Sequence, residues 1–243
     1  MFLGLVQSNK KYKTIMPLFC QSLIKIPVHL FFTAVCDMRV TGREHVDQLV
    51  KAGHYPVIFA ANHVSELDPI VITDAMPFWS KFMPLYYVAR GQGSYNKAQF
   101  GWKHYIYGGS FFKAFGAYPV VSGTQDYSKS LVNHVNLLKK GKSILIFPEG
   151  KWRDGGKERL PAHGGVAYLA EVSGCPVVPV HIQVDGARKL TMRDLFHGDV
   201  RLRVVFGAPV IVSELLGNER TDDPERYRRA ASRVMERVNQ LDG

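Results

Sequence analysis

The hydrophobic and polar positions of this chain fall into two patterns, short apolar runs and longer segments with helical spacing. Short apolar runs are typical of buried strands, and they cover residues 56–61, 85–89, 117–121, 143–147 and 176–184. Residues 200–206 alternate with a period of two, as a half-exposed strand does. Helical spacing covers residues 69–75, part of 94–116, 126–140, 162–173 and 225–241. Strands that alternate with helices predict one α/β domain with a mostly parallel or mixed central sheet flanked by helices.

The N-terminal segment has a different pattern. Residues 14–36 are rich in Ile, Leu, Phe and Val but include Gln21, Lys25 and His29. A membrane-spanning helix needs about 20 mostly apolar residues with few charges, and Lys25 beside Pro27 argues against such a span. We expect two short amphipathic helices that meet near Pro27 and lie in the membrane interface. An ordinary helix packed on the domain is the alternative.

The boundary of this segment divides the chain into two parts. We predict a membrane-associating helical segment at residues 1–37 and an α/β domain at residues 38–243, because no linker interrupts the second part. Lys10, Lys11 and Lys13 precede the apolar stretch and would lie among anionic headgroups. No cleavable signal peptide is evident. We therefore expect membrane association at the cytoplasmic face.

Composition narrows the class of partner. Lys and Arg number 31 against 21 for Asp and Glu, which gives a net charge of +10. Such a charge indicates an anionic partner, either nucleic acid, a membrane surface or a phosphorylated substrate; a basic surface that serves only solubility is the alternative. No nucleic-acid-binding motif is present, so we expect no nucleic acid. The spacing of Cys20, Cys36 and Cys175 matches neither a zinc site nor a redox pair, which favours a reducing compartment and no metal.

The first candidate site is the segment Asn62-His63-Val64-Ser65-Glu66-Leu67-Asp68. It follows a predicted strand, and strand ends are where open α/β sheets bind ligands. Histidine suits a general base, and a carboxylate can orient its ring. On a straight helix His63 and Asp68 would lie about 140° apart, so they meet only if a loop curls back before the helix. Asp68 is then also the expected N-cap, with Pro69 as the first helical residue.

The second candidate site is Phe147-Pro148-Glu149-Gly150, which follows another predicted strand. Gly150 would let a ligand approach the backbone closely. Lys151 and Arg153 come next and offer positive charge to a phosphate. Taken alone, either segment is also compatible with a structural role, as a capped helix start or a solvated turn.

Together these segments resemble the phospholipid/glycerol acyltransferase family, whose best-known members acylate 1-acylglycerol-3-phosphate. The family pattern Asn-His-x4-Asp is matched at Asn62, His63 and Asp68, and Phe-Pro-Glu-Gly is matched at residues 147–150. A glycine segment follows at residues 163–165, and a strand built around a proline follows at residues 177–180. The order of the four blocks carries the resemblance, which runs from about residue 40 to residue 210.

Two departures from the family pattern fall on the side that binds the acceptor phosphate. The second family block usually ends in an arginine, and Ser122 stands there. The third block commonly continues Thr-Arg, whereas this chain has Lys151 and Trp152, with Arg153 one position later. Lys113, Lys151 or Arg153 would then supply the missing charge.

The resemblance implies an O-acyltransferase of phospholipid biosynthesis that uses no cofactor and no metal. His63 would deprotonate the acceptor hydroxyl, which attacks the thioester of acyl-CoA or acyl carrier protein, the co-substrate, while Asp68 orients His63. Asn62, Ser122, Lys151, Arg153 and residues 147–150 would bind substrate. The acceptor would be a membrane lysophospholipid, 1-acylglycerol-3-phosphate before others. A different lipid acceptor, a weakly active lipid-binding protein and a covalent route through Ser65 are the alternatives.

Overall fold

A mixed β-sheet runs through the protein, whose computed structural model describes residues 15–89, 110–121, 126–151, 160–186, 200–217 and 224–242. In these residues seven strands pair in the order β1-β7-β6-β2-β5-β3-β4. Five run parallel, namely β6 (Val177–Asp185), β2 (Ile58–Ala61), β5 (Ile144–Ile146), β3 (Tyr86–Ala89) and β4 (Ala117–Pro119). β7 (Arg201–Phe206) is antiparallel to β6, and β1 (Arg39–Thr41) is parallel to β7. The predicted α/β class is confirmed.

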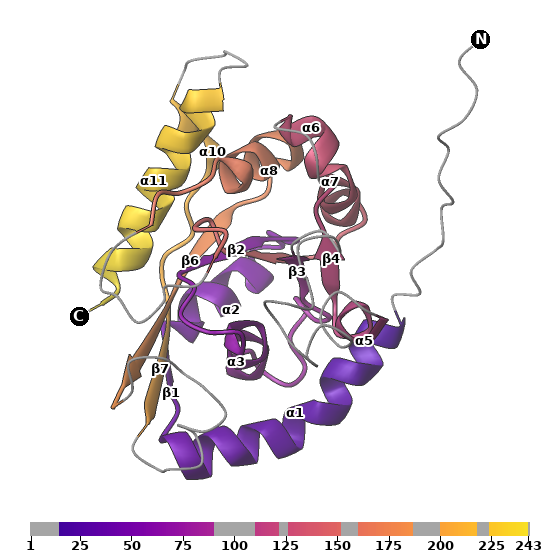
Figure 1. Ribbon diagram of the computed structural model, residues 1–243, viewed down its shortest axis with the longest axis vertical. Coiled ribbons are helices and arrows are strands. Elements are labelled where there is room, and N and C mark those ends of the chain that lie inside the picture. The colour runs from indigo at the N-terminus through magenta and orange to yellow at the C-terminus, as the bar shows by residue number, and fades with distance from the viewer. Residues whose placement is uncertain are drawn as a thin grey trace, which may run out of the picture.

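Helices cover both faces of this sheet (Figure 1). One face carries α1 (Ile15–Cys36), α2 (Arg43–Lys51) and α3 (Asp68–Ala75). The other carries α7 (Val132–Lys139), α8 (Gly165–Ser173), α10 (Val212–Leu216) and α11 (Pro224–Gln240). Two short helices, α5 (Ser110–Ala114) and α6 (Tyr127–Ser130), complete the described helices. The sheet thus has a hydrophobic core on each side.

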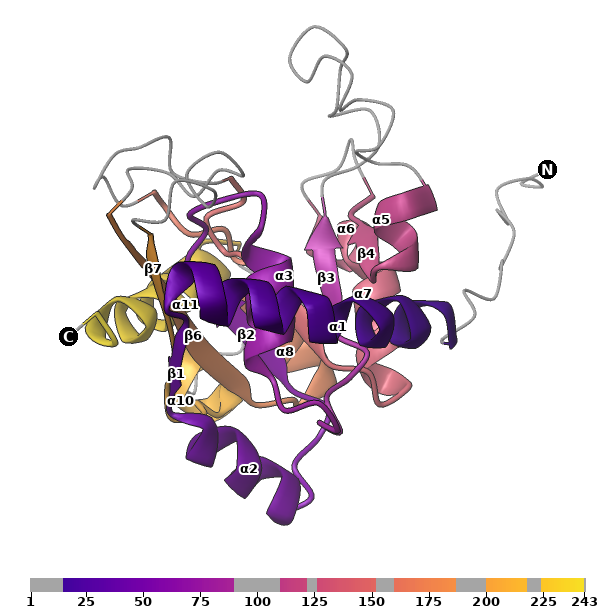
Figure 2. The ribbon, with the colours of Figure 1, turned by 90° about the horizontal axis from the view of Figure 1, so that it is seen from below.

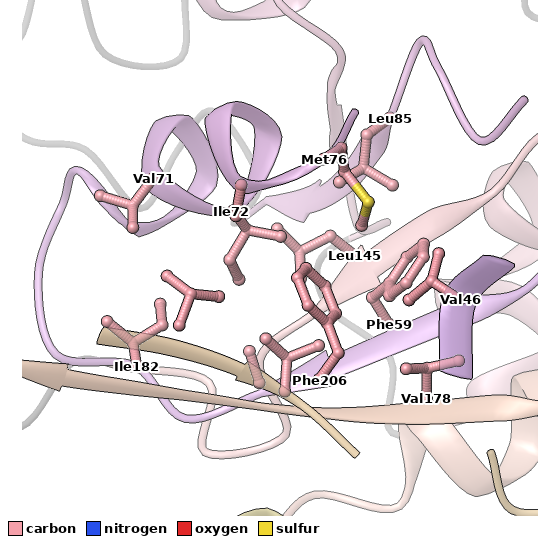
Figure 3. Close-up of a cluster of buried hydrophobic side chains, with 14 of the residues drawn as sticks. Val46, Phe59, Val71, Ile72, Met76, Leu85, Leu145, Val178, Ile182 and Phe206 are labelled. Carbon is pink, nitrogen blue, oxygen red and sulfur yellow. The ribbon is translucent and has the colours of Figure 1, made fainter. Parts of the chain in front are cut away.

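The central strand β2 supplies both cores. Its side chains alternate between the faces with the period of two that a pleated strand imposes. Ile58 and Ala60 pack toward α7 and α8, whereas Phe59 and Ala61 pack toward α1 and α3. Figure 3 shows Phe59 from β2 in the core on the side of α3, together with Ile72 from that helix. A strand buried on both faces explains the unbroken apolar run read in the sequence.

The N-terminal segment is one helix, so the prediction of two short helices meeting near Pro27 was wrong. Pro27 costs the helix one backbone hydrogen bond and crowds the carbonyl four residues earlier, and contacts of α1 with the domain on both sides of Pro27 offset that cost. The Gln21 amide donates to the carbonyl oxygens of Leu85 and Phe115 at 2.7 and 2.8 Å, and it accepts from the Leu85 amide at 3.0 Å. Phe32 and Cys36, further along α1, belong to the same core as α3. Gln21 and Lys25, which are uncommon in an apolar segment, therefore face the protein.

The outer face of α1 is apolar and exposed. Phe19, Leu23, Ile26 and Leu30 are each between 59% and 65% exposed. Figure 2 shows α1 lying across the front of the molecule, ahead of α3. Among the described helices, α1 alone has the length and apolar composition to cross a membrane. Its docked polar side chains, however, tie it lengthwise to the domain.

Two further differences concern local backbone. The predicted helix at residues 126–140 is divided into α6 and α7 at Leu131, whose φ of −107° lies outside the helical range. β1 and α2 were not predicted, and for β1 the reason is that three residues of strand give little periodic signal. Gly42 joins β1 to α2 with a φ of +75°, and a Cβ there would lie 1.9 Å from the carbonyl oxygen of Phe206. Only glycine fits that junction.

Candidate active site

The two sequence motifs meet at one edge of the sheet because their strands are neighbours. β2 and β5 pair in parallel, with Ala60 opposite Ile146. The chain therefore leaves both strands at their carboxyl ends, where α/β sheets bind ligands. The ring of His63 stacks on the ring of Phe147, with centroids 4.1 Å apart and planes 16° apart. Phe147 thus supports one face of the imidazole.

His63 and Asp68 form a hydrogen-bonded pair, and residues 62–67 curl back as a loop before α3. Nδ1 of His63 lies 2.7 Å from Oδ2 of Asp68. The Asp68 carboxylate is fully buried, whereas the His63 side chain is 14% exposed. The same carboxylate accepts from the amides of Val64 and Ser65 and from the Ser65 hydroxyl, at 2.7 to 3.1 Å.

These contacts determine the tautomer of His63. A carboxylate surrounded by N–H and O–H donors acts only as an acceptor, so Nδ1 of His63 donates the proton in the bond to Asp68. The lone pair of the neutral ring then lies on Nε2. This is the state in which an imidazole can take a proton from a hydroxyl.

The position of Asp68 differs from the prediction in one respect. Asp68 is the first residue of α3 and Leu67 is the N-cap, so Pro69 is the second helical residue. The carboxylate of Asp68 points back into the loop, where it binds the amides of Val64 and Ser65, instead of capping its own helix. The prediction that Asp68 is the N-cap was therefore wrong.

Ser65 is placed where it cannot act as a nucleophile. Its side chain is fully buried. Its hydroxyl donates to Oδ1 of Asp68 at 2.8 Å and accepts from the Leu67 amide at 3.1 Å. Ser65 thus fixes the loop, and the geometry gives no support to the covalent serine route.

Asn62 and Glu149 hold the motif to its neighbours. The Asn62 side chain donates to the carbonyl oxygen of Ile182 at 2.8 Å and accepts from the Ile182 amide at 2.7 Å, so it joins the end of β2 to β6. Oε2 of Glu149 accepts from the backbone amide of His63 at 3.0 Å. Both side chains are 2% exposed. Asn62 thus fixes the backbone just before His63 and Glu149 fixes that of His63 itself, and a contact with substrate stays a prediction for both.

The turn at residues 147–150 is tightly packed. The Gly150 amide donates to the carbonyl oxygen of Phe147 at 3.0 Å, and the His163 amide donates to that of Pro148 at 2.8 Å. Gly150 has a φ of +68°, and a Cβ there would lie 2.9 Å from the His163 ring. The exposed His163 therefore lies against the second motif. The sequence placed His163 only in the glycine segment at residues 163–165, because nothing local marks this long-range contact.

The predicted phosphate-binding residues are only partly described. Lys151 is exposed at the end of the turn, and Lys113 is half-buried in α5. Ser122 and Arg153 lie outside the described residues. Among the described residues no group of three or more His, Cys, Asp or Glu side chains is arranged to hold a metal ion.

A small hollow lies between α1 and α3. Apolar side chains of α1, α3 and β3 line it, namely Ile24, Val28, Pro69, Ile70 and Tyr87, and so do the polar Gln21, Lys25, Thr73 and Asp74. Pro69 directly follows Asp68 in the chain.

Comparison with known proteins gives the family to which this fold, with its histidine–aspartate pair at the strand ends, belongs. Residues 37–183 match the family model described as Acyltransferase, and this chain belongs to that family. The fold is similar to that of PlsC, the 1-acyl-sn-glycerophosphate acyltransferase from Thermotoga maritima, with a TM-score of 0.54 and 18% identity over 93% of this chain and 83% of that one. The search of curated proteins finds no match.

Proposed function

We propose that this protein transfers a fatty acyl group from acyl-CoA or acyl carrier protein to the hydroxyl of a lysophospholipid, with 1-acylglycerol-3-phosphate as acceptor and phosphatidic acid as product. The observation that carries the proposal is the His63–Asp68 pair. Asp68 is buried, the His63 side chain is partly exposed, and the backbone amide of His63 donates to Glu149. Membership of the acyltransferase family supports the reaction class. The acceptor is inferred from the basic charge of the chain and from its family resemblance.

The proposed chemistry needs one general base. Nε2 of His63 takes the proton of the acceptor hydroxyl as its oxygen attacks the thioester carbon. The carbon–sulfur bond then breaks, and the thiolate leaves with the proton that His63 gives back. Asp68 holds the ring and stabilises the imidazolium formed in between.

We further propose that α1 lies in the cytoplasmic membrane interface with its outer face in lipid. A single exposed apolar side chain is ordinary on a protein surface, but four on one face of a helix form an apolar patch of the kind that contacts a membrane. The inner face stays on the domain through Gln21 and Lys25. The acceptor would then reach His63 from the same bilayer that α1 contacts.

The test is a direct assay of transfer. Purified protein is incubated with radiolabelled acyl-CoA, or acyl carrier protein, and a panel of lysolipids in vesicles, and the product is identified by chromatography. His63→Ala is the matched inactive control. Labelled phosphatidic acid formed by the wild-type protein alone supports the proposal. No product with any lysolipid would contradict it.

One observation favours a second acceptor class. Ser122 stands where the family resemblance leads us to expect a phosphate-binding arginine. If no other cation has taken over, the preferred acceptor is a lysolipid with another headgroup or a lipid hydroxyl without phosphate. The same assay distinguishes these acceptors when the panel contains anionic lysolipids, zwitterionic lysolipids and a lipid alcohol without phosphate.

A further inference from the structure

Lys25 is a cation that α1 places against the end of α3. The side chain is 6% exposed, and its ammonium donates to the carbonyl oxygens of Thr73 at 2.7 Å and Met76 at 2.8 Å. These carbonyls belong to the last turn of α3 and the residue after it, where a helix has unsatisfied acceptors and the negative end of its dipole. Burial lowers the pKa of Lys25 from 10.5 to about 8, so the charge is held there against a desolvation penalty.

α3 connects this contact to the catalytic pair. The helix has eight residues and is therefore about 12 Å long, with Asp68 at one end and the carbonyls bound by Lys25 at the other. A second cation binds the same end, since Nε of Arg43 donates to the carbonyl oxygen of Ala75 at 3.0 Å. A two-turn helix moves as one piece, so a shift at its carboxyl end tilts Asp68 and the ring of His63 that Asp68 holds.

The helix that carries Lys25 also carries the exposed apolar face. Lys25 faces the domain, while Leu23 and Ile26, its close neighbours in the chain, are 65% and 59% exposed on the outer face. The helix that we assign to the membrane interface is thus hydrogen-bonded to the catalytic helix. Packing alone does not require this residue, because a methionine would fill the space without burying a charge.

We propose that Lys25 is a positioning residue for acyl transfer, which couples the seating of α1 to the alignment of Asp68 and His63 through α3. The proposal rests on the proposed function for the reaction itself. Lys25 does not touch the reacting atoms. It acts by fixing the helix from which the carboxylate reaches the imidazole.

The test compares Lys25→Met, Lys25→Arg and the control Lys51→Met, which removes a charge from an exposed position at the end of α2. Vesicle-bound protein is assayed for kcat and for the KM of the acyl donor. The rate at which diethyl pyrocarbonate modifies His63 is followed separately by peptide mass spectrometry, without substrate. Thermal unfolding and vesicle co-sedimentation verify that the variants are folded and bound.

Lys25→Met should lower kcat about 10- to 100-fold, the scale of a small misplacement of catalytic groups, with little change in KM. It should also slow the modification of His63. Lys25→Arg should retain most of the wild-type kcat and of the His63 modification rate, because arginine also places a cation at the carbonyls. Lys51→Met should match the wild-type protein in both measurements. A Lys25→Met variant with normal kcat and normal His63 reactivity would overturn the proposal.

Two arms keep the test decisive. If even the wild-type protein transfers no acyl group, the proposed function fails, and His63 reactivity alone decides the role of Lys25. If Lys25→Met does not fold, Lys25→Gln replaces it, since an amide retains donors for the carbonyls but lacks the charge. An intermediate loss is then expected, and unchanged kcat and reactivity would again reject the proposal.

Discussion

Asp68 accepts hydrogen bonds from His63, Val64 and Ser65 with two buried oxygens. In Asp68→Asn one oxygen becomes an NH2 group that faces donors, and each buried group left unpaired costs about 1–3 kcal/mol. We therefore expect this variant to lose both turnover and stability, as measured by kcat and by urea unfolding. A variant with normal kcat would remove Asp68 from the mechanism.

His63→Ala tests the base without disturbing this network as strongly. The Asp68 carboxylate keeps its bonds to Val64 and Ser65, so we expect the protein to stay folded, with a loss of stability limited to the ring's contacts with Phe147 and Asp68. Turnover should fall roughly 10²- to 10⁴-fold, the usual contribution of a general base. Steady-state kinetics on both variants, each normalised to folded protein, separates the two roles. Near-normal activity of His63→Ala would show that another group is the base.

Ser122→Arg tests the acceptor. A bidentate bond from arginine to phosphate contributes about 1.5–3 kcal/mol, so the substitution should lower the KM for 1-acylglycerol-3-phosphate and leave a zwitterionic lysolipid unaffected. Both lipids are assayed side by side. No change with either lipid would mean that residue 122 does not face the acceptor phosphate.

The candidate site was predictable from sequence where the partners are close in the chain. The loop between His63 and Asp68 followed from the angle that a helix would impose, since only a curled loop brings the two together. The bonds of Asn62 to Ile182 and of Glu149 to the His63 amide were not predictable. Their partners lie 120 and 86 residues away, and only the strand order places them next to each other.

At the scale of elements, strands were located well and α1 poorly. An apolar run buried on both faces of a sheet is a strong local signal, as residues 58–61 show. Lys25 and Pro27 argued for a break in the N-terminal segment, because a sequence does not show that Thr73 and Met76 provide acceptors for the ammonium. Contacts between α1 and α3 therefore allow one continuous helix where the local sequence predicted two short ones.

The outer face of α1 gives a prediction for membrane binding. Deleting the segment would also remove core residues such as Phe32 and Cys36, so substitution is the better test. Leu23→Ser with Leu30→Ser should sharply weaken co-sedimentation with anionic vesicles, since each buried leucine contributes about 1.5–3 kcal/mol. The control Val172→Ser changes an exposed apolar residue of α8, on the other side of the sheet. Unchanged binding would move the contact elsewhere, for example to the arginines of α11.

Across the whole molecule, acid should weaken the fold through His134. Burial lowers the pKa of His134 from 6.5 to about 4, against a weaker opposing effect of its hydrogen bond to Tyr118. Between these two values the unfolded chain binds more protons than the folded one, so stability falls as pH drops from 6.5 to 4. The shift corresponds to about 3 kcal/mol of the free energy of unfolding.

Urea unfolding at several pH values measures this effect. His134→Gln keeps an N–H donor for Tyr118 but does not titrate in this range. The difference in stability between wild type and variant should therefore shrink as pH falls from 6.5 to 4. A difference that is independent of pH would show that His134 does not cause the acid sensitivity.

The two outermost strands of the sheet have a consequence for association in water. β1 and β4 have three residues each, and β4 ends at Pro119, which has no amide to offer an incoming strand. Strand-to-strand addition at either edge is thus disfavoured. Among the described surfaces, the exposed apolar face of α1 is then where copies of the protein would associate when lipid is absent. Adding bilayers should disperse such oligomers, because lipid then covers the apolar face of α1. The oligomeric state measured without lipid would therefore differ from that of the membrane-bound protein.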